Sequence, residues 1–256
     1  MRTVNQYYRT LQKAAVSPIS NFVYWSFNGD GIDEVNAKAP SQIIGVNFNG
    51  AGILGSALTS GDGATDVLFY ADHEDFSFTA GGGVDLPFSF SFWMNPTSIV
   101  GFGAWIINKR NAAPGGDEYQ ISLGLDGRIR LTLFDRFNPS RYISIHSVST
   151  AFGALNGMWK HVVITYDGSK SSAGINFYLN ANLEAITDLS VGVYTGMANG
   201  TARLAFLNGG WQQRSTTKFY GKLDEFGIWK NKILTPSQVS FLYNNGAGVP
   251  YPLTGL

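Results

Sequence analysis

Residues 219–246 read FYGKLDEFGIWKNKILTPSQVSFLYNNG, and this stretch decides the fold of the chain. Its first half is an apolar run that predicts a strand, and its second half carries the signals of one short helix. Thr235 is a suitable N-cap for that helix, and Pro236 suits its first position. We expect the helix to lid one end of the fold. The strand also holds two adjacent acids, Asp224 and Glu225, whose role needs an explanation.

The rest of the chain continues the strand pattern. From residue 21 onward, short apolar runs are separated by Gly, Asn and Asp. FSFSFWM at residues 88–94 alternates Phe with Ser, which is the period of a strand with one buried face. YQISLGLDGRIRLTLF at residues 119–134 predicts a hairpin with a tight turn at Asp126 and Gly127. With no helix of useful length between these runs, we expect an all-β, two-sheet antiparallel jelly-roll sandwich.

Composition narrows the possible functions. Charged residues make up only 14% of the 256 residues, the formal net charge is zero, and cysteine is absent. A neutral chain has no electrostatic basis for binding nucleic acid, and without cysteine there are no disulfides or cysteine-based zinc sites. No run approaches the ~20 apolar residues of a membrane span. The first residues also lack the continuous apolar core of a secretory leader.

Residues 1–20 are predicted to form an amphipathic arm separate from the jelly-roll domain of residues 21–256. Within residues 1–17, apolar side chains recur at helical spacing and the basic residues lie off that stripe. Two interpretations stay open: a helix folded back on its own domain, or an arm that docks another subunit or partner. A frayed terminus is a third. The residues expected to make the docking contact are Tyr7, Tyr8 and Leu11.

The order of these segments resembles the laminin-G-like domains of the concanavalin A-like lectin and glucanase superfamily. WKHVVITYD at residues 159–167 and the segment 221–244 carry the resemblance, which extends over roughly residues 21–246. One departure is Asn180-Ala181-Asn182, where the family usually has an Asp-Gly turn. The resemblance implies two curved antiparallel sheets, ligands on the concave face or the rim loops, and in many members one calcium ion. The fold hosts lectins, adhesion modules, hydrolases and viral structural proteins, so it does not decide the function.

Strand alternation places Asp224 on the same face as Phe226 and Ile228, with Leu223 and Glu225 on the other face. An ionised carboxylate beside buried apolar residues is costly unless it is paired or metal-bound. The resemblance implies a structural calcium site between Asp224 and the loop after the first strand, where hard oxygen ligands are available. The expected ligands are Asp224, Asp33, Asp30 and Asn28. The alternative is that Asp224 accepts backbone N–H bonds or pairs with a Lys or Arg.

The distribution of acids argues against catalysis. Laminarinase-type hydrolases of the superfamily place three acids at alternate positions along one strand, and no strand of this chain does so. Glu74 and Asp75 are adjacent, which would send them to opposite faces of a strand. We therefore expect no enzymatic activity, and a glycoside hydrolase is the least favoured interpretation.

Glycan binding is favoured by a glycine-rich loop, NGGWQQR at residues 208–214, in which Trp211 could stack on a sugar ring. The loop at residues 134–141 adds polar side chains. The alternative for Trp211 is a packing residue or the anchor of a subunit interface. The expected glycan or partner contacts are Trp211, Gln212, Arg214, Asp135 and Arg141.

Taken together, these features predict a non-enzymatic structural or adhesion protein. The first hypothesis is a phage virion component, made in the host cytoplasm, whose lectin-like domain contacts other virion proteins or host-surface glycans and which self-associates through its arm. The missing leader, the missing cysteine and the amphipathic arm fit that hypothesis. The alternative is a carbohydrate-binding module of a bacterial secreted or surface protein.

Overall fold

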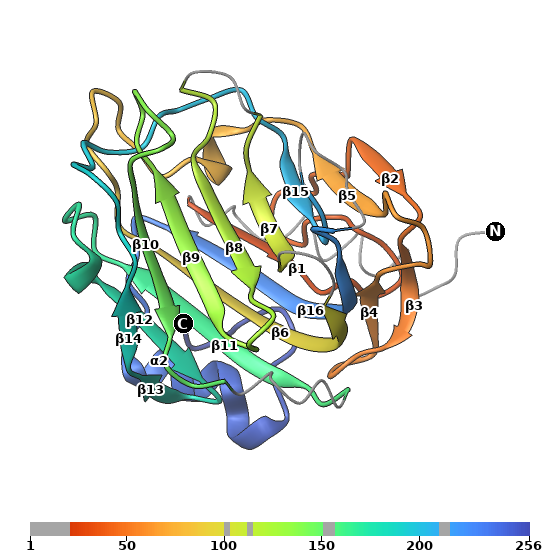
Figure 1. The fold of residues 1–256 in the computed structure, drawn as a ribbon. Helices are drawn as coiled ribbons and strands as arrows, with labels where there is room; N and C mark the ends of the chain where they lie inside the picture. Colours follow the sequence, from red (N-terminus) through yellow and green to blue (C-terminus); the bar gives the residue numbers. More distant parts are fainter. Residues whose placement is uncertain (1–20, 100–102, 112–114, 151–156, 210–215) are drawn as a thin grey trace.

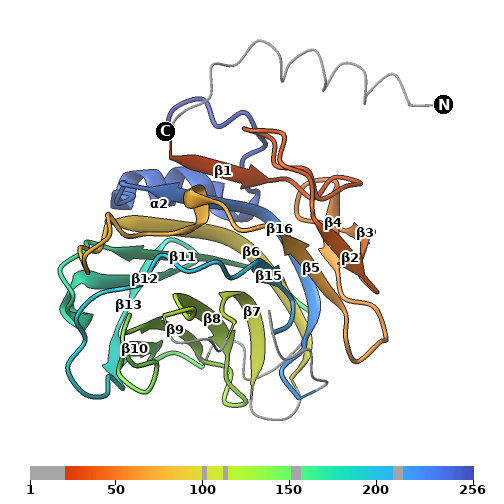
Figure 2. The same ribbon diagram turned by 90° about the horizontal axis from the view of Figure 1, so that it is seen from above.

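The structure, a computed structural model, describes residues 21–99, 103–111, 115–150, 157–209 and 216–256. Within these residues the strands form two antiparallel sheets of eight strands each, packed face to face (Figures 1 and 2). The prediction of an all-β sandwich is therefore confirmed. The arm residues Tyr7, Tyr8 and Leu11 lie outside the described residues.

Sheet A has the order β13-β12-β11-β6-β16-β4-β3, and β1 pairs with β16 beside this path. Its strands are β1 (Phe22–Trp25), β3 (Asn47–Ala51), β4 (Ser56–Thr59), β6 (Phe88–Ile99), β11 (Lys160–Tyr166), β12 (Ile175–Leu179), β13 (Asn182–Glu184) and β16 (Phe219–Lys230). The long strands β6 and β16 lie side by side at its centre.

Sheet B has the order β14-β10-β9-β8-β7-β15-β5-β2. Its strands are β2 (Gln42–Ile44), β5 (Val67–Tyr70), β7 (Ala104–Lys109), β8 (Tyr119–Leu123), β9 (Ile129–Phe134), β10 (Tyr142–Ser147), β14 (Ile186–Asp188) and β15 (Leu204–Phe206). Short 3₁₀ helices occupy Glu74–Phe76, Ser172–Gly174 and Asn244–Gly246. None of the helices in the described residues has the length and apolar character of a membrane span.

The core between the sheets is rich in aromatic side chains. Phe226 of sheet A meets Phe206 of sheet B edge to face, with ring centroids 5.0 Å apart. Phe90 of sheet A lies 5.6 Å from Tyr119 of sheet B, centroid to centroid. The alternation predicted for β6 is confirmed, because its phenylalanines are buried in this core. Aromatic side chains bury large apolar areas, so such pairs stabilise the contact between the two layers.

The hairpin predicted for residues 119–134 is also confirmed, with a longer turn than expected. Strand β8 ends at Leu123 and β9 begins at Ile129. The connection is closed by backbone hydrogen bonds from Gly124 to Arg128 and from Gly127 to Gly124, each 2.9 Å. The turn thus needs five residues instead of two, with Gly127 in the left-handed region at φ 76°.

The prediction of strict alternation around Asp224 was wrong. The register against β6 shifts between Asp224, which faces Trp93, and Gly227, which faces Ser91. Glu225, with φ 48°, is the extra residue of this β-bulge. Because of the bulge, Leu223 and Phe226 both lie in the core between the sheets, although alternation placed them on opposite faces.

The C-terminal helix α2 (Pro236–Tyr243) has the predicted capping box. The Gln238 backbone N–H donates to Thr235 Oγ1 at 3.3 Å, and the Thr235 N–H donates to Gln238 Oε1 at 3.0 Å. The helix does not lid an end of the sandwich as expected. Val239 and Leu242 instead pack with Trp229 on the outer face of sheet A, where Figure 2 shows α2 over β16.

Beneath α2, His161 of β11 is buried in a polar and aromatic setting. Its Nε2 lies 2.9 Å from Ser91 Oγ, and its ring lies 5.0 Å from Trp93 and 6.0 Å from Tyr243, centroid to centroid. Burial lowers the pKa of His161 to about 3. His161 therefore has a structural role in the packing of α2 against sheet A.

His161 should make the fold sensitive to acid. Because the unfolded side chain has a pKa of about 6.5, only the unfolded chain binds this proton between pH 6.5 and 3. The stability contributed by His161 is therefore complete above pH 6.5 and is lost as the pH falls toward 3. Between pH 7 and pH 4, we expect the wild type to lose about 2–3 kcal/mol more unfolding free energy than a His161→Phe variant. Urea unfolding of both proteins at both pH values measures this, and equal losses would contradict it.

Candidate functional site

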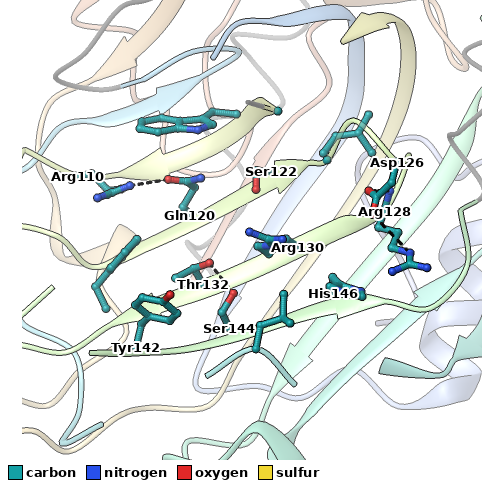
Figure 3. Close-up of a pocket in the computed structure, with 16 residues that line it drawn as sticks. Arg110, Gln120, Ser122, Asp126, Arg128, Arg130, Thr132, Tyr142, Ser144 and His146 are labelled. Carbon is teal, nitrogen blue, oxygen red and sulfur yellow. Dashed lines mark hydrogen bonds and ion pairs between the residues drawn. The ribbon is translucent and has the colours of Figure 1, made fainter. Parts of the chain in front are cut away.

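The outward face of sheet B carries a groove of about 300 Å³. Its floor comes from β7, β8, β9 and β10, which run side by side in Figure 3. The groove follows from strand alternation, because every second residue of these strands must point away from the core. Ile121 and Leu131 face the core, whereas their neighbours Gln120, Arg130 and Thr132 line the groove.

Strand register arranges the outward side chains in rows across the sheet. In one row Trp105 of β7 faces Ser122 of β8, Ser122 faces Arg130 of β9, and Arg130 faces His146 of β10. Neighbouring strands are about 4.8 Å apart, so each side chain lies beside the next. A second row holds Gln120, Thr132 and Ser144, and a third holds Phe134 and Tyr142.

Arg110 organises the end of the groove nearest β7. Its guanidinium carbon lies 4.1 Å from the ring centroid of Phe134 and 5.3 Å from that of Trp105. It also donates hydrogen bonds of 2.8 Å to Gln120 Oε1 and to Asp117 Oδ2. Since Oε1 of Gln120 accepts from Arg110, the amide orientation is set and its NH₂ group remains a donor.

The other end of the groove, on β9 and β10, has hydroxyl and imidazole groups. Thr132 Oγ1 and Ser144 Oγ are 3.0 Å apart, and Figure 3 shows this pair between the two strands. His146 Nδ1 lies 2.8 Å from the Ser147 carbonyl oxygen. A carbonyl only accepts, so Nδ1 carries the hydrogen and Nε2 is left as the second ring nitrogen.

Carboxylates are scarce in this groove. Among the described residues that line it, Asp126 is the one acid, and its side chain is 55% exposed in the loop between β8 and β9. A retaining glycosidase needs two carboxyl groups about 5–5.5 Å apart. The described part of the groove therefore offers hydrogen-bonding and stacking groups without an acid pair.

The predicted rim contacts have different outcomes. Trp211, Gln212 and Arg214 lie outside the described residues. Asp135 was expected at the rim, but the structure places it in the interior with 1% exposure. Arg141 is partly exposed and lies 3.4 Å from Asp135, nitrogen to oxygen.

The surroundings of Asp135 explain its position. Its carboxylate accepts hydrogen bonds of 2.6 Å from both the N–H and the hydroxyl of Thr195, and a 3.0 Å bond from the Phe137 N–H. Burial raises the pKa of Asp135, but these bonds and the Arg141 charge outweigh it and hold the pKa below its usual range. Asp135 thus joins two loops and has no free oxygen for a sugar.

Two of the four predicted calcium ligands, Asp224 and Asn28, lie at the β3–β4 turn, where they accept hydrogen bonds from backbone N–H groups. Asp224 Oδ2 accepts N–H bonds from Ile53 at 2.8 Å and Leu54 at 3.1 Å. Asn28 Oδ1 accepts one from Ser56 at 2.7 Å. Burial raises the pKa of Asp224 to about 7, although these N–H groups and that of Glu225 act in the opposite direction.

The other two predicted ligands serve the loop after β1. Asp33 accepts N–H bonds of 3.0 Å from Tyr24, Val35 and Asn36, and Asp30 accepts one of 2.9 Å from Ile32. In the described part of the chain, no three His, Cys, Asp or Glu side chains gather as metal ligands would. These oxygen atoms already accept hydrogen bonds from backbone N–H groups, and calcium binding at these residues is a hypothesis that a melting experiment can test.

The second acid of the opening segment also has a partner. The Tyr24 hydroxyl donates a hydrogen bond to Glu225 Oε2, which joins β1 to the bulge of β16. Burial, followed by the charge of Glu225, raises the pKa of Tyr24 well above its ordinary value, so the phenol stays protonated. Asp224 and Glu225 therefore attach the last strand to β1 and to the β3–β4 turn.

A two-sheet jelly roll with a polar and aromatic groove on the outward face of one sheet is the architecture of a lectin-like sandwich. The chain belongs to the concanavalin A-like lectin/glucanases superfamily, whose family model matches residues 61–240. No curated protein is detectably similar to it in sequence.

Several solved structures share the fold. The binding domain of Paraclostridial Mosquitocidal Protein 1 is 20% identical with a TM-score of 0.64, over 88% of this chain and 52% of that one. Domain 4 of AbnA, a GH43 extracellular arabinanase from Geobacillus stearothermophilus, solved with arabinotriose, is 21% identical with a TM-score of 0.57, over 85% and 95%. The binding domain of Botulinum neurotoxin DC, in complex with SialylT, is 18% identical with a TM-score of 0.57, over 87% and 50%. The chain thus spans about half the length of the two toxin domains.

The groove residues were not among the predicted contacts, although their signal is present in the sequence. In YQISLGLDGRIRLTLF and RYISIH, polar residues alternate with apolar ones. Alternation identifies the outward set, but it does not say that β7, β8, β9 and β10 lie next to one another. The missed residues are Trp105, Arg110, Gln120, Ser122, Arg130, Thr132, Phe134, Tyr142, Ser144 and His146.

The calcium prediction can be tested, because Asp224 and Asp33 already accept hydrogen bonds from backbone N–H groups. We expect the melting temperature to be the same in excess calcium and in excess chelator, because backbone N–H groups already occupy these oxygens. A calcium ion present at 100 times its dissociation constant would add about 2.7 kcal/mol of stability. Differential scanning calorimetry in the two buffers measures the difference. As a control, Asp224→Ala should lose about 1–3 kcal/mol equally in both buffers, and a calcium-dependent rise in the wild type would contradict our account.

Proposed function

We propose that the chain is a lectin-like domain that binds a carbohydrate in the groove of sheet B and does not cleave it. The observation that supports this most is the row arrangement of the groove. Aromatic rings from Trp105, Phe134 and Tyr142 stand beside hydroxyl, amide and guanidinium groups on adjacent strands. Sugars offer apolar ring faces and many hydroxyls, and they are bound by side chains of these two kinds.

The groove is favoured over the rim loop as the binding site because its side chains stand on paired strands. Side chains on paired strands are held by the sheet, so less conformational entropy is lost when a ligand binds. Arg110 and Gln120 hold each other at 2.8 Å, and Thr132 and Ser144 are 3.0 Å apart. The volume of about 300 Å³ is at the lower end of the range for ligand sites.

The structural neighbours support the same function. The arabinanase domain is a structure in complex with arabinotriose, and the two toxin neighbours are binding domains, one in complex with SialylT. The absence of an acid pair in the described part of the groove supports binding without hydrolysis.

The biological setting that we propose is a phage virion, with the groove contacting host-surface glycans and residues 1–20 contacting other subunits. The alternative is a module of a bacterial secreted or surface protein. Capsid or tail genes beside this gene would support the virion. Self-association that persists after deletion of residues 1–17 would count against the docking arm.

Binding in the groove predicts a specific loss. A Trp105→Ala variant should bind carbohydrate about ten-fold more weakly than the wild type, because the ring face on which a sugar stacks is removed. A glycan array identifies the ligand, and isothermal titration calorimetry with the best glycan compares the variants. The variant's melting curve is recorded first to confirm that it is folded.

A matched Trp211→Ala variant separates this groove from the rim loop. If the loss follows Trp211 and Trp105→Ala binds normally, the ligand lies at the rim and the groove assignment is wrong. If the wild type binds no glycan on the array, the proposed function itself is wrong.

A further inference from the structure

We infer that the groove selects acidic carbohydrates, and that Arg130 is the specificity-determining residue that binds their carboxylate or sulfate group. The inference rests on the proposed function and adds the chemical class of the ligand. It starts from charge. The described charged residues that line the groove are three arginines, Arg110, Arg128 and Arg130, and one aspartate, Asp126, in a chain whose net charge is zero.

The three arginines differ in their partners. Arg110 is paired with Asp117 at 2.8 Å, and Arg128 Nε lies 3.6 Å from Asp126. The Arg130 side chain makes no hydrogen bond or ion pair with any other residue that the structure describes. Its guanidinium therefore keeps its donors and its charge for a ligand.

Two buried cations of the described residues show what a structural role requires. Lys218 is buried and lies 2.6 Å from Asp66, and Lys109 is buried against Glu118 and 2.8 Å from Asp72. Arg130 is instead exposed, and no acid of the described residues pairs with it. Its charge therefore faces the space that a ligand in the groove would fill.

Arg130 stands at the centre of the groove floor. Its strand β9 lies between β8 and β10, where Ser122 and His146 are its direct register partners, and Figure 3 shows its side chain between theirs. A ligand that fills the groove must therefore cover the guanidinium. Its planar fork of N–H donors matches the oxygens of a carboxylate or sulfate.

The cost of desolvating Arg130 explains why an acidic sugar should bind more tightly than a neutral one. A neutral sugar over Arg130 would remove water from the charge and return only neutral hydrogen bonds. An acidic sugar returns charge-assisted hydrogen bonds and also compensates the excess positive charge of the groove. Thr132, Ser144 and Gln120 then remain for the sugar hydroxyls, so one ligand can satisfy both sets of groups.

Nucleic acid, the other common polyanion, is disfavoured. Its binding relies on several phosphate contacts along a basic surface, whereas this groove has one unpaired arginine in a chain of zero net charge. A single-stranded oligonucleotide is therefore included in the test as a competing ligand.

The experiment uses the full chain on a glycan array in which each uronic acid, sialylated or sulfated glycan is matched by its neutral counterpart. Calorimetry follows with the best pair. We expect the acidic member to bind about ten-fold or more tightly than the neutral one, and Arg130→Gln to remove that difference. Arg130→Lys, which keeps the charge without the fork, should restore part of it. The carboxylated and sulfated members show which acidic group is preferred.

Lys170→Gln is the matched control, because it removes one positive charge from an exposed residue outside the groove lining. It should leave the acidic preference unchanged. Equal binding of acidic and neutral members, or an unchanged preference in Arg130→Gln, would overturn the inference while the proposed function stands. Binding of the oligonucleotide in place of every glycan would overturn both, as would the absence of any binding.

Discussion

The alternation of side chains along β8, β9 and β10 is the constraint on which the rest of this structure depends. Every second side chain of these strands packs in the core against sheet A. The side chains between them must therefore point to the outward face of sheet B. Register then places the outward residues of four strands beside one another. The same pattern that stabilises the sandwich thus holds a polar and aromatic surface rigidly in place.

The two acids of β16, Asp224 and Glu225, lie where the strand departs from regular alternation. A bulge at Glu225 lets two successive carboxylates leave the regular pattern, and each joins the last strand to a distant part of the chain. Asp224 holds the turn at Ile53 and Leu54, and Glu225 holds Tyr24. Since their partners are a phenol and backbone N–H groups, Glu225 stabilises the seam between the first and last strands and Asp224 stabilises the β3–β4 turn. The binding function that we propose lies on the opposite sheet.

Local signals made much of the fold predictable. The Phe and Ser alternation of β6, the hairpin of residues 119–134 and the capping box of Thr235 and Gln238 depend on neighbours in sequence, and each is present in the structure. The bulge was not predictable, because it is stabilised by contacts between residues about 170 to 200 positions apart. The groove needed the strand order of sheet B in addition to its alternation. The apolar face of α2 shows the same limit, since its sequence does not say which surface of the sandwich it covers.

The most direct measurement of the central claim, that the outward face of sheet B is the binding surface, is a crystal structure of the chain with an acidic oligosaccharide. Our account predicts a sugar ring against the aromatic side chains of β7 to β10. Its carboxylate or sulfate oxygens should lie within hydrogen-bonding distance of the Arg130 guanidinium. A sugar bound at residues 208–214 or on the face covered by α2, with the groove of sheet B empty, would contradict the account.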